Sequence, residues 1–430
     1  WCKNHPDILT GWNVKFFDMP YLMNRMRYIF DNDTINKMSP WNYVNADRIQ
    51  LGNKSNQIWN ILGISVLDYF DLYKKFTYVR QESYKLNYIA KVELGEQKLD
   101  NPYETFKDFY TKDYQRFVEY NIQDVELVDR LEDKMKLIEL CLTMAYDYKV
   151  NYTDVYSQVR CWDTIIYNHL LTKDIIIPPR EDQVKDTQYE GAYVKDPQLG
   201  LHNWIVSFDL NSLYPHLIMQ YNISPETFVG TEPKAVGVEN FLDEKLNLKW
   251  AKDRNLTIAP NGAMFKRDKQ GFLPELMEKM YTERVVYKKK AIEAKIEYQK
   301  TKDPIYSNEI SRCHNIQMAK KISLNSAYGA IGNQYFRYFD VKQAEAITLG
   351  GQLSIRWIER DVNKFMNKLL GTDNKNYVVA SDTDSIYLKL DTLVEKVCKN
   401  KSTKQIVDFL DKAAEEKIQK VIDSSFENLA

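Results

Sequence analysis

A short acidic hairpin is the feature that most constrains how this chain can fold. Residues 377–380 are rich in β-forming side chains, and residues 384–390 alternate between apolar and polar ones. Two such runs joined by small polar residues predict a β-hairpin. Asp382 and Asp384 lie in its turn, where two like charges repel each other. A divalent cation would offset that repulsion, because Mg²⁺ prefers oxygen ligands; an exposed acidic turn is the alternative. The side chains expected to face the core are Ile386, Leu388 and Leu390.

The composition describes a soluble globular protein with room for two or three domains. The chain has 430 residues, of which 28% are charged and 44% hydrophobic, and no apolar run is long enough to cross a bilayer. Its five scattered cysteines argue against a disulfide framework or a zinc ribbon and suit a reducing compartment. The formal charge of -1 provides no overall basic field, so any nucleic-acid site must be local.

A third carboxylate lies where a predicted strand runs into a helix. Residues 205–208 form the strand, Asp209 ends it, and a tight turn leads into the helix. The backbone of such a turn can direct carbonyls and amides toward a ligand. This position is therefore a candidate binding site.

Two long helices predict an α-hairpin in the middle of the chain. The first runs from Gly271 to about Lys302 and the second from Asn308 to Tyr328, with a break near Asp303-Pro304.

Basic side chains gather on one face of each of these helices. Arg284 and Lys288 are one turn apart on the first, and Lys321, Asn325 and Tyr328 share a face of the second. Cations aimed from two helices at one point predict a cradle for a triphosphate, and Tyr328 offers an aromatic surface to a base pair.

The first third of the chain contains a second set of carboxylates. A helix with Pro20 in its first turn is predicted to begin near Asp18. In a later helix, Tyr120 and Asp124 are four residues apart and lie side by side. Taken as pattern alone, the sequence favours a helix cap for Asp18 and a solvated charge for Asp124. The apolar residues of the later helix expected to face the core are Val118, Ile122, Val125 and Val128.

Two further acidic residues of this part, Asp68 and Asp71, lie in an apolar run that is typical of a strand. We interpret both as structural.

Several segments in order resemble the motifs of family B DNA polymerases, especially those of T-even-type bacteriophages, over essentially the whole chain. The segments are Gly11-Trp-Asn13 with Phe17-Asp18, Tyr120-Asn121 with Asp124, Tyr189-Glu-Gly191-Ala192, Asp209 to Tyr214-Pro, Lys321-Ile-Ser-Leu-Asn325-Ser-Ala-Tyr328-Gly329 and Ser381-Asp382-Thr-Asp384-Ser385.

The resemblance implies a two-metal polymerase site. Asp209 and Asp384 would be the essential ligands of two Mg²⁺ ions, with the Leu210 backbone and Asp382 in support. Ions about 3.5–4 Å apart suit an in-line phosphoryl transfer, and Lys321 would act with them on the phosphates.

The same resemblance implies a deoxynucleotide pocket. Tyr214 would be the steric gate that excludes a 2′-hydroxyl. His216 replaces the Ser common at its position, where we expect a packing change without loss of activity. The nucleotide-binding residues would be Leu213, Tyr214, Arg284, Lys288, Lys321, Asn325 and Tyr328.

In the first third, the resemblance is to a 3′→5′ exonuclease. Asp18 and Asp124 would bind further metal ions, and Tyr120 would position the attacking water. The family's first exonuclease motif, Asp-x-Glu, is missing from the sequence. We therefore predict little or no proofreading from this chain.

The predicted fold is a multidomain α/β chain, a fragment that lacks the N-terminal part and the thumb. It combines a truncated ribonuclease-H-like exonuclease domain with a polymerase palm that carries α-hairpin fingers. The predicted boundaries are exonuclease 1–136, connector 137–180, palm 181–270, fingers 271–332 and palm 333–430.

The predicted function is template-directed DNA synthesis in viral replication, in the cytoplasm of an infected bacterial host. Primer–template DNA and deoxynucleoside triphosphates are the expected substrates. The resemblance also implies a sliding clamp, a helicase and a single-strand-binding protein as partners, and no membrane. A 3′→5′ exonuclease, an inactive scaffold and one piece of a split polymerase remain as alternatives.

Overall fold

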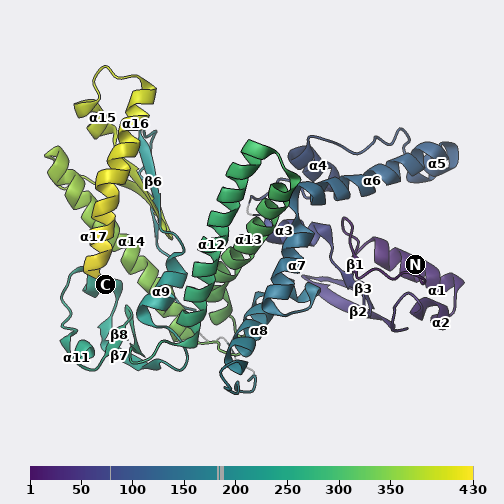
Figure 1. The fold of residues 1–430 in the computed structure, drawn as a ribbon, viewed down its shortest axis with the longest axis horizontal. Helices are drawn as coiled ribbons and strands as arrows, with labels where there is room; N and C mark the ends of the chain where they lie inside the picture. Colours follow the sequence, from purple (N-terminus) through teal and green to yellow (C-terminus); the bar gives the residue numbers. More distant parts are fainter. Residues whose placement is uncertain (78, 182–183, 185–187, 430) are drawn as a thin grey trace. The chain divides into compact units, whose positions relative to one another are not determined.

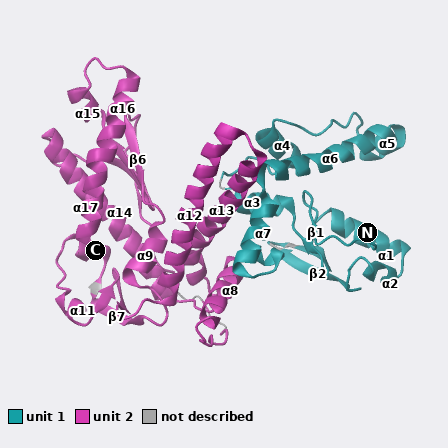
Figure 2. Cartoon of the chain, viewed as in Figure 1, with its two compact units in different colours: residues 1–157 teal, residues 158–430 magenta. Residues whose placement is uncertain are grey.

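The chain forms two compact units, residues 1–157 and residues 158–430 (Figure 2). The computed structural model describes residues 1–77, 79–181, 184 and 188–429. Helices and strands occur in both units, which confirms the predicted mixed α/β class (Figure 1). Within the described ranges, no helix combines the length and the apolar character needed to cross a membrane.

The first unit combines short strands with helices. Strand β1 (Ile8–Leu9) pairs in parallel with β4 (Ser65–Val66), and β2 (Val44–Leu51) pairs with β3 (Lys54–Ile61) as an antiparallel hairpin. Its helices are α1 (Asp18–Ile29), α2 (Asn32–Asn36), α3 (Tyr69–Phe76), α4 (Leu86–Leu94), α5 (Phe106–Lys112), α6 (Tyr114–Met135), α7 (Leu137–Tyr148) and the 3-10 helix η1 (Tyr152–Tyr156).

Hydrogen bonds to the Asp68 carboxylate hold the loop that precedes α1. The predicted strand through this region is wrong, because α3 begins at Tyr69 and Asp68 is its N-cap. The buried Asp68 carboxylate accepts hydrogen bonds from the backbone N–H groups of Asn13 (2.8 Å), Lys15 (3.0 Å) and Phe70 (3.0 Å). Its role is structural, as predicted, and it shapes the segment that leads to Asp18.

The buried face of α6 differs from the predicted one. Ile122 and Val125 are 51% and 66% exposed, whereas Leu127, Val128 and Leu131 are buried. The reason is that α5 packs against a neighbouring face of α6, where the Phe109 ring contacts Phe117 and Tyr120. The apolar spacing was real, but the buried face lies about a third of a turn away from the predicted one, at 3.6 residues per turn.

The second unit is built around a four-stranded sheet in the order β5-β10-β11-β6. Its strands are β5 (Val194–Lys195), β6 (Ile205–Asp209), β10 (Val378–Asp382) and β11 (Ser385–Lys389), and a separate sheet contains β7 (Phe228–Val236), β8 (Leu256–Ile258) and β9 (Asn261–Lys266). Its helices are α8 (Gln158–Leu171), α9 (Leu213–Tyr221), α10 (Val238–Leu242), α11 (Lys249–Asp253), α12 (Phe272–Thr301), α13 (Pro304–Ile331), α14 (Val341–Leu370), α15 (Asp391–Val397), α16 (Thr403–Ala413), the π-helix η2 (Ala414–Ile418) and α17 (Gln419–Leu429).

The predicted acidic hairpin is confirmed as β10 and β11. Ile386, Leu388 and Leu390 are buried as expected, in a core that also contains Ile358 and Val362 of α14. Burial of one side of the hairpin fixes its register, because a slip by one residue would expose the apolar set. The turn between the strands is therefore held in a defined place.

The predicted α-hairpin is also confirmed, as α12 and α13. Asp303 caps α13 with its side chain and Pro304 is the first helical residue, which explains the break. Lys320 of α13 forms an ion pair with Glu283 of α12 at 2.6 Å. The predicted domain boundaries remain predictions.

Candidate active site

The hairpin turn between β10 and β11 brings Asp384 next to Asp209, which ends β6. The Asp384 N–H donates to the Asp382 carbonyl at 2.6 Å, around Thr383 with a φ of 55°. The Asp384 carbonyl accepts from the Leu210 N–H at 2.8 Å, directly after Asp209 at the end of β6. The end of β6 therefore lies against the hairpin turn, with Asp209 next to Asp384.

The pKa of Asp384 reflects its burial and the nearby charge of Asp209. Burial raises the pKa of the Asp384 carboxyl above its ordinary value, and the nearby charges of Asp209 and then Asp382 raise it further. No lysine or arginine of the described residues is among the groups that shift it. The turn is thus a place where negative charge accumulates and a cation would be stabilising.

A cavity of about 270 Å³ opens beside these carboxylates. It brings together most of the predicted polymerase residues, with cationic side chains from α12 and α13 lining the same space as the carboxylates. The predicted residues that line it are Asp209, Leu210, Leu213, Tyr214, Arg284, Lys321, Asn325 and Asp384.

Three predicted residues are not among the described residues that line this cavity: Asp382, Lys288 and Tyr328. The Asp382 carboxylate accepts a hydrogen bond from the Thr383 hydroxyl at 2.9 Å. Tyr328 lies behind Tyr214, with ring centroids 5.0 Å apart in an edge-to-face arrangement. The roles predicted for these three residues remain predictions.

Tyr214 and Tyr328 are held in place by their surroundings. Burial raises the pKa of Tyr214 to about 12, so its hydroxyl stays protonated. The Tyr328 hydroxyl donates to the Tyr189 hydroxyl at 3.2 Å, and Tyr189 in turn packs closely over Gly332. The aromatic wall of the site therefore begins in the segment before β5.

Arg284 offers an unpaired donor to the site. Its Nη1 donates to Asn211 Oδ1 at 3.4 Å and to Ser212 Oγ at 3.3 Å. Its Nε is buried and has no hydrogen-bond partner among the described residues. A buried donor without a partner costs free energy, so a bound anion would stabilise this arrangement.

Sequence reasoning missed four residues that line the cavity: Asn211, Ser212, Pro215 and Thr383. The signal was their position, because Asn211, Ser212 and Thr383 lie in the two turns beside Asp209 and Asp384, and Pro215 lies in the first turn of α9. Ser212 and Thr383 both have positive φ values, 57° and 55°. Such values are uncommon for residues other than glycine and are concentrated at functional sites.

The carboxylates fit a metal ion that substrate helps to hold. The described residues contain no group of three or more His, Cys, Asp or Glu side chains placed to hold a metal ion. Mg²⁺ is often bound by only one or two carboxylates, with water and substrate phosphates completing its shell. Asp209 and Asp384 meet that requirement, and Arg284 and Lys321 line the space where phosphates would lie.

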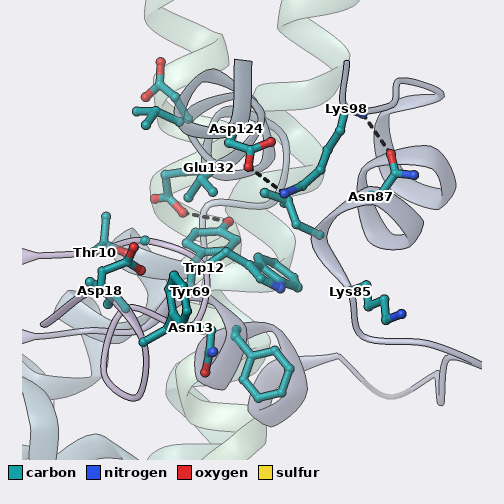
Figure 3. Close-up of a pocket in the computed structure, with 18 of the residues that line it drawn as sticks. Thr10, Trp12, Asn13, Asp18, Tyr69, Lys85, Asn87, Lys98, Asp124 and Glu132 are labelled. Carbon is teal, nitrogen blue, oxygen red and sulfur yellow. Dashed lines mark hydrogen bonds and ion pairs between the residues drawn. The ribbon is translucent and has the colours of Figure 1, made fainter. Parts of the chain in front are cut away.

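The first unit contains a separate, larger cavity of about 950 Å³ (Figure 3). Both predicted exonuclease carboxylates, Asp18 and Asp124, line it. Burial raises the pKa of Asp18, and Asp124 forms an ion pair with Lys98 at 2.6 Å (Figure 3). One of the two carboxylates therefore already has a cationic partner.

Tyr120, the third predicted exonuclease residue, is not among the described residues that line this cavity. Its ring packs against Phe106 and Phe109, and Lys98 Nζ lies 5.5 Å from its centroid. Tyr120 is thus connected to Asp124 through Lys98, and its predicted role in positioning water remains a prediction.

Comparison with known proteins covers both units. A family model described as DNA polymerase family B matches residues 150–428, and one described as DNA polymerase family B, exonuclease domain, matches residues 1–89.

Individual relatives match over most or all of the chain. The DNA-directed DNA polymerase of Escherichia phage RB69 is 35% identical, over 100% of this chain and 52% of the relative. That of Enterobacteria phage T4 is 32% identical, over 100% of this chain and 52% of the relative. The DNA polymerase delta catalytic subunit of Drosophila melanogaster is 28% identical, over 89% of this chain and 34% of the relative. The chain thus spans about half the length of the phage relatives.

Proposed function

Because the chain belongs to DNA polymerase family B, we propose that its second unit catalyses template-directed DNA synthesis. The reaction adds a deoxynucleoside monophosphate to the 3′ end of a primer and releases pyrophosphate. The observation that carries this proposal is one cavity that the carboxylates Asp209 and Asp384 line together with the cationic residues Arg284 and Lys321.

The two kinds of charge match a triphosphate bound together with metal ions: the carboxylates suit the metal ions, and the cationic side chains suit the phosphates. Arg284 and Lys321 bind the triphosphate, and Lys321 stabilises the negative charge that develops on the leaving pyrophosphate. Lys288, one turn beyond Arg284 on α12, extends this basic surface. A protein that bound DNA without catalysis would need no such pairing of acidic and basic groups in one small cavity.

Family B DNA polymerases depend on metal ions, generally Mg²⁺. When bound, two such ions activate the primer 3′-hydroxyl and neutralise the triphosphate. Asp209 and Asp384 would hold them, with the Leu210 carbonyl as a further oxygen ligand and Asp382 in support. The uncompensated charge at Asp384 supports this assignment.

Tyr214 lines the cavity and receives the sugar, and Tyr328, which packs against the Tyr214 ring, receives the base. Tyr214 excludes a 2′-hydroxyl by occupying its space, and its close packing against Tyr328 supports a fixed position for the ring. Leu213 and Asn325 complete the lining of the pocket. The expected preference is for deoxynucleotides.

The substrates are primer–template DNA and deoxynucleoside triphosphates, and the setting is viral DNA replication in the cytoplasm of an infected bacterial cell. The phage origin of two of the relatives supports this setting. A sliding clamp, a helicase and a single-strand-binding protein are proposed partners.

A second candidate function is 3′→5′ exonuclease activity in the first unit. The cavity that holds Asp18 and Asp124 supports it. The ion pair between Asp124 and Lys98 removes negative charge that metal ions would otherwise use. We therefore expect at most weak exonuclease activity beside the polymerase activity.

A labelled primer–template assay with Mg²⁺ tests both functions. With deoxynucleotides, we expect the chain to lengthen the primer and Asp384→Asn to abolish that lengthening. Without deoxynucleotides, we expect little shortening of the primer. Strong shortening that survives in Asp384→Asn and disappears in Asp124→Asn would favour the nuclease and contradict the polymerase proposal if no lengthening occurs.

A further inference from the structure

A chain of contacts behind the cavity connects Arg284 to two aromatic side chains. We propose that Tyr281, acting through Asn211 and supported by His216, positions the Arg284 guanidinium for the triphosphate. This inference rests on the proposed function, because it assigns positioning residues to the same site. Tyr281 and His216 are not among the described residues that line the cavity, so they would act only through others.

Asn211 is the central link, because both ends of its amide are engaged. Its Nδ2 donates to the Tyr281 hydroxyl at 3.2 Å, and its Oδ1 accepts from Arg284 Nη1 at 3.4 Å. An amide has a donor end and an acceptor end, and a guanidinium can only donate. If the amide turned over, its NH₂ group would face the guanidinium and the bond would be lost. The donor-only guanidinium selects this amide orientation. The Tyr281 hydroxyl on Nδ2, together with the Ser212 hydroxyl that donates to Oδ1 at 3.2 Å, anchors the amide in it.

Tyr281 is itself held by His216, the residue that departs from the family's usual Ser. The two rings meet edge to face with centroids 4.7 Å apart. His216 Nδ1 lies 2.9 Å from the Ser212 carbonyl, so Nδ1 carries the proton and donates to it. Because His216 belongs to α9 and Tyr281 to α12, the contact also connects these two helices beside Asn211.

The orientation of Arg284 matters because its binding atoms lie in one plane. A guanidinium recognises phosphate best through two parallel N–H groups, which requires that plane to be aimed at the ligand. Its two bonds to Asn211 and Ser212 both involve Nη1, and its buried Nε is left without a partner among the described residues. Contacts that hold Nη1 therefore set the direction in which Nε and Nη2 point.

The test is Tyr281→Phe, which removes the hydroxyl and keeps the ring against His216. In single-nucleotide insertion on a primer–template, we expect KM for the deoxynucleotide to rise roughly 3- to 10-fold, the effect of losing one hydrogen bond. We expect kcat to stay within about 2-fold, because the triphosphate is held in both ground state and transition state. The matched control is Tyr298→Phe, on the same helix with its ring against Lys302, which should leave KM unchanged.

A double-mutant cycle distinguishes positioning from general destabilisation. Arg284→Ala alone should raise KM, and adding Tyr281→Phe to it should change nothing further, because the guanidinium to be positioned is gone. His216→Ala, which removes the ring support, should raise KM in the wild type but not beside Arg284→Ala.

The outcomes separate this inference from the function on which it rests. If Arg284→Ala raises KM and Tyr281→Phe does not, the positioning role is wrong and the polymerase proposal stands. An equal rise from Tyr281→Phe with and without Arg284 would also overturn it. If the wild-type chain neither inserts nor binds a deoxynucleotide on primer–template DNA, both proposals fail.

Discussion

Asp68 offers a prediction whose size can be worked out bond by bond. Its Oδ1 accepts from the N–H groups of Asn13 and Phe70, and its Oδ2 accepts from that of Lys15. Asp68→Ala leaves three partly buried N–H groups without their acceptor, each of which costs about 1 kcal/mol. We therefore expect the first unit to lose about 3 kcal/mol of unfolding free energy.

The variant Asp68→Asn should distinguish the contributions of the two carboxylate oxygens. The amide oxygen can keep the bonds from Asn13 and Phe70, whereas the amide nitrogen would face the Lys15 N–H, donor against donor. The expected loss is about 1–2 kcal/mol, between the wild type and the alanine variant. Asp71→Asn is the matched control in the same helix and should change stability by less than about 0.5 kcal/mol.

Urea unfolding combined with residue-resolved hydrogen exchange measures both effects. In Asp68→Asn, the Lys15 amide should lose protection while the Asn13 and Phe70 amides keep most of theirs. In Asp68→Ala, all three should lose protection. Equal urea midpoints for all variants, or unchanged Lys15 exchange in Asp68→Asn, would refute the reasoning.

Three further predictions concern the second unit. Because the pKa of Asp384 is raised in the folded chain, its contribution to stability is present below its ordinary pKa of 3.8 and is lost as the pH rises through the folded value. In metal-free buffer, Asp384→Asn should therefore gain stability over the wild type as the pH rises from 3.5 to 7, by less than about 1 kcal/mol because solvent screens this partly exposed carboxyl, measured by thermal unfolding; a constant difference would contradict this. Tyr214→Ala should lower discrimination against ribonucleotides roughly 10-fold or more in insertion assays, and unchanged discrimination would exclude the steric gate. Gly332→Ala should cost about 1–3 kcal/mol in urea unfolding, because a methyl group there would overlap the Tyr189 hydroxyl. Adding Tyr189→Phe should restore part of that loss, and a simple sum of the two effects would show that the overlap is not the cause.

The site of the second unit could be predicted from the sequence because its signals are local. The alternating residues of β11 and the break at Asp303-Pro304 each define an element by themselves. Asp209 ends a strand, Asp384 lies in a turn, and Arg284 and Lys321 have clear helical spacing. The predicted elements place these four residues around one cavity.

Contacts between distant segments could not be predicted in this way. The buried face of α6 depends on where α5 packs, which no periodicity reveals. Asp68 lies more than fifty residues from Asn13 and Lys15, yet it organises their loop. The links from Tyr281 to Asn211 and from Lys98 to Asp124 likewise join segments that only the fold brings together.

The most direct test of the central claim is single-nucleotide insertion opposite each of the four template bases, in Mg²⁺, by the wild-type chain and Asp209→Asn. The account predicts that the wild type adds only the complementary deoxynucleotide and that Asp209→Asn adds none. Addition that ignores the template base, or that persists in Asp209→Asn, would contradict a template-directed polymerase site at Asp209 and Asp384.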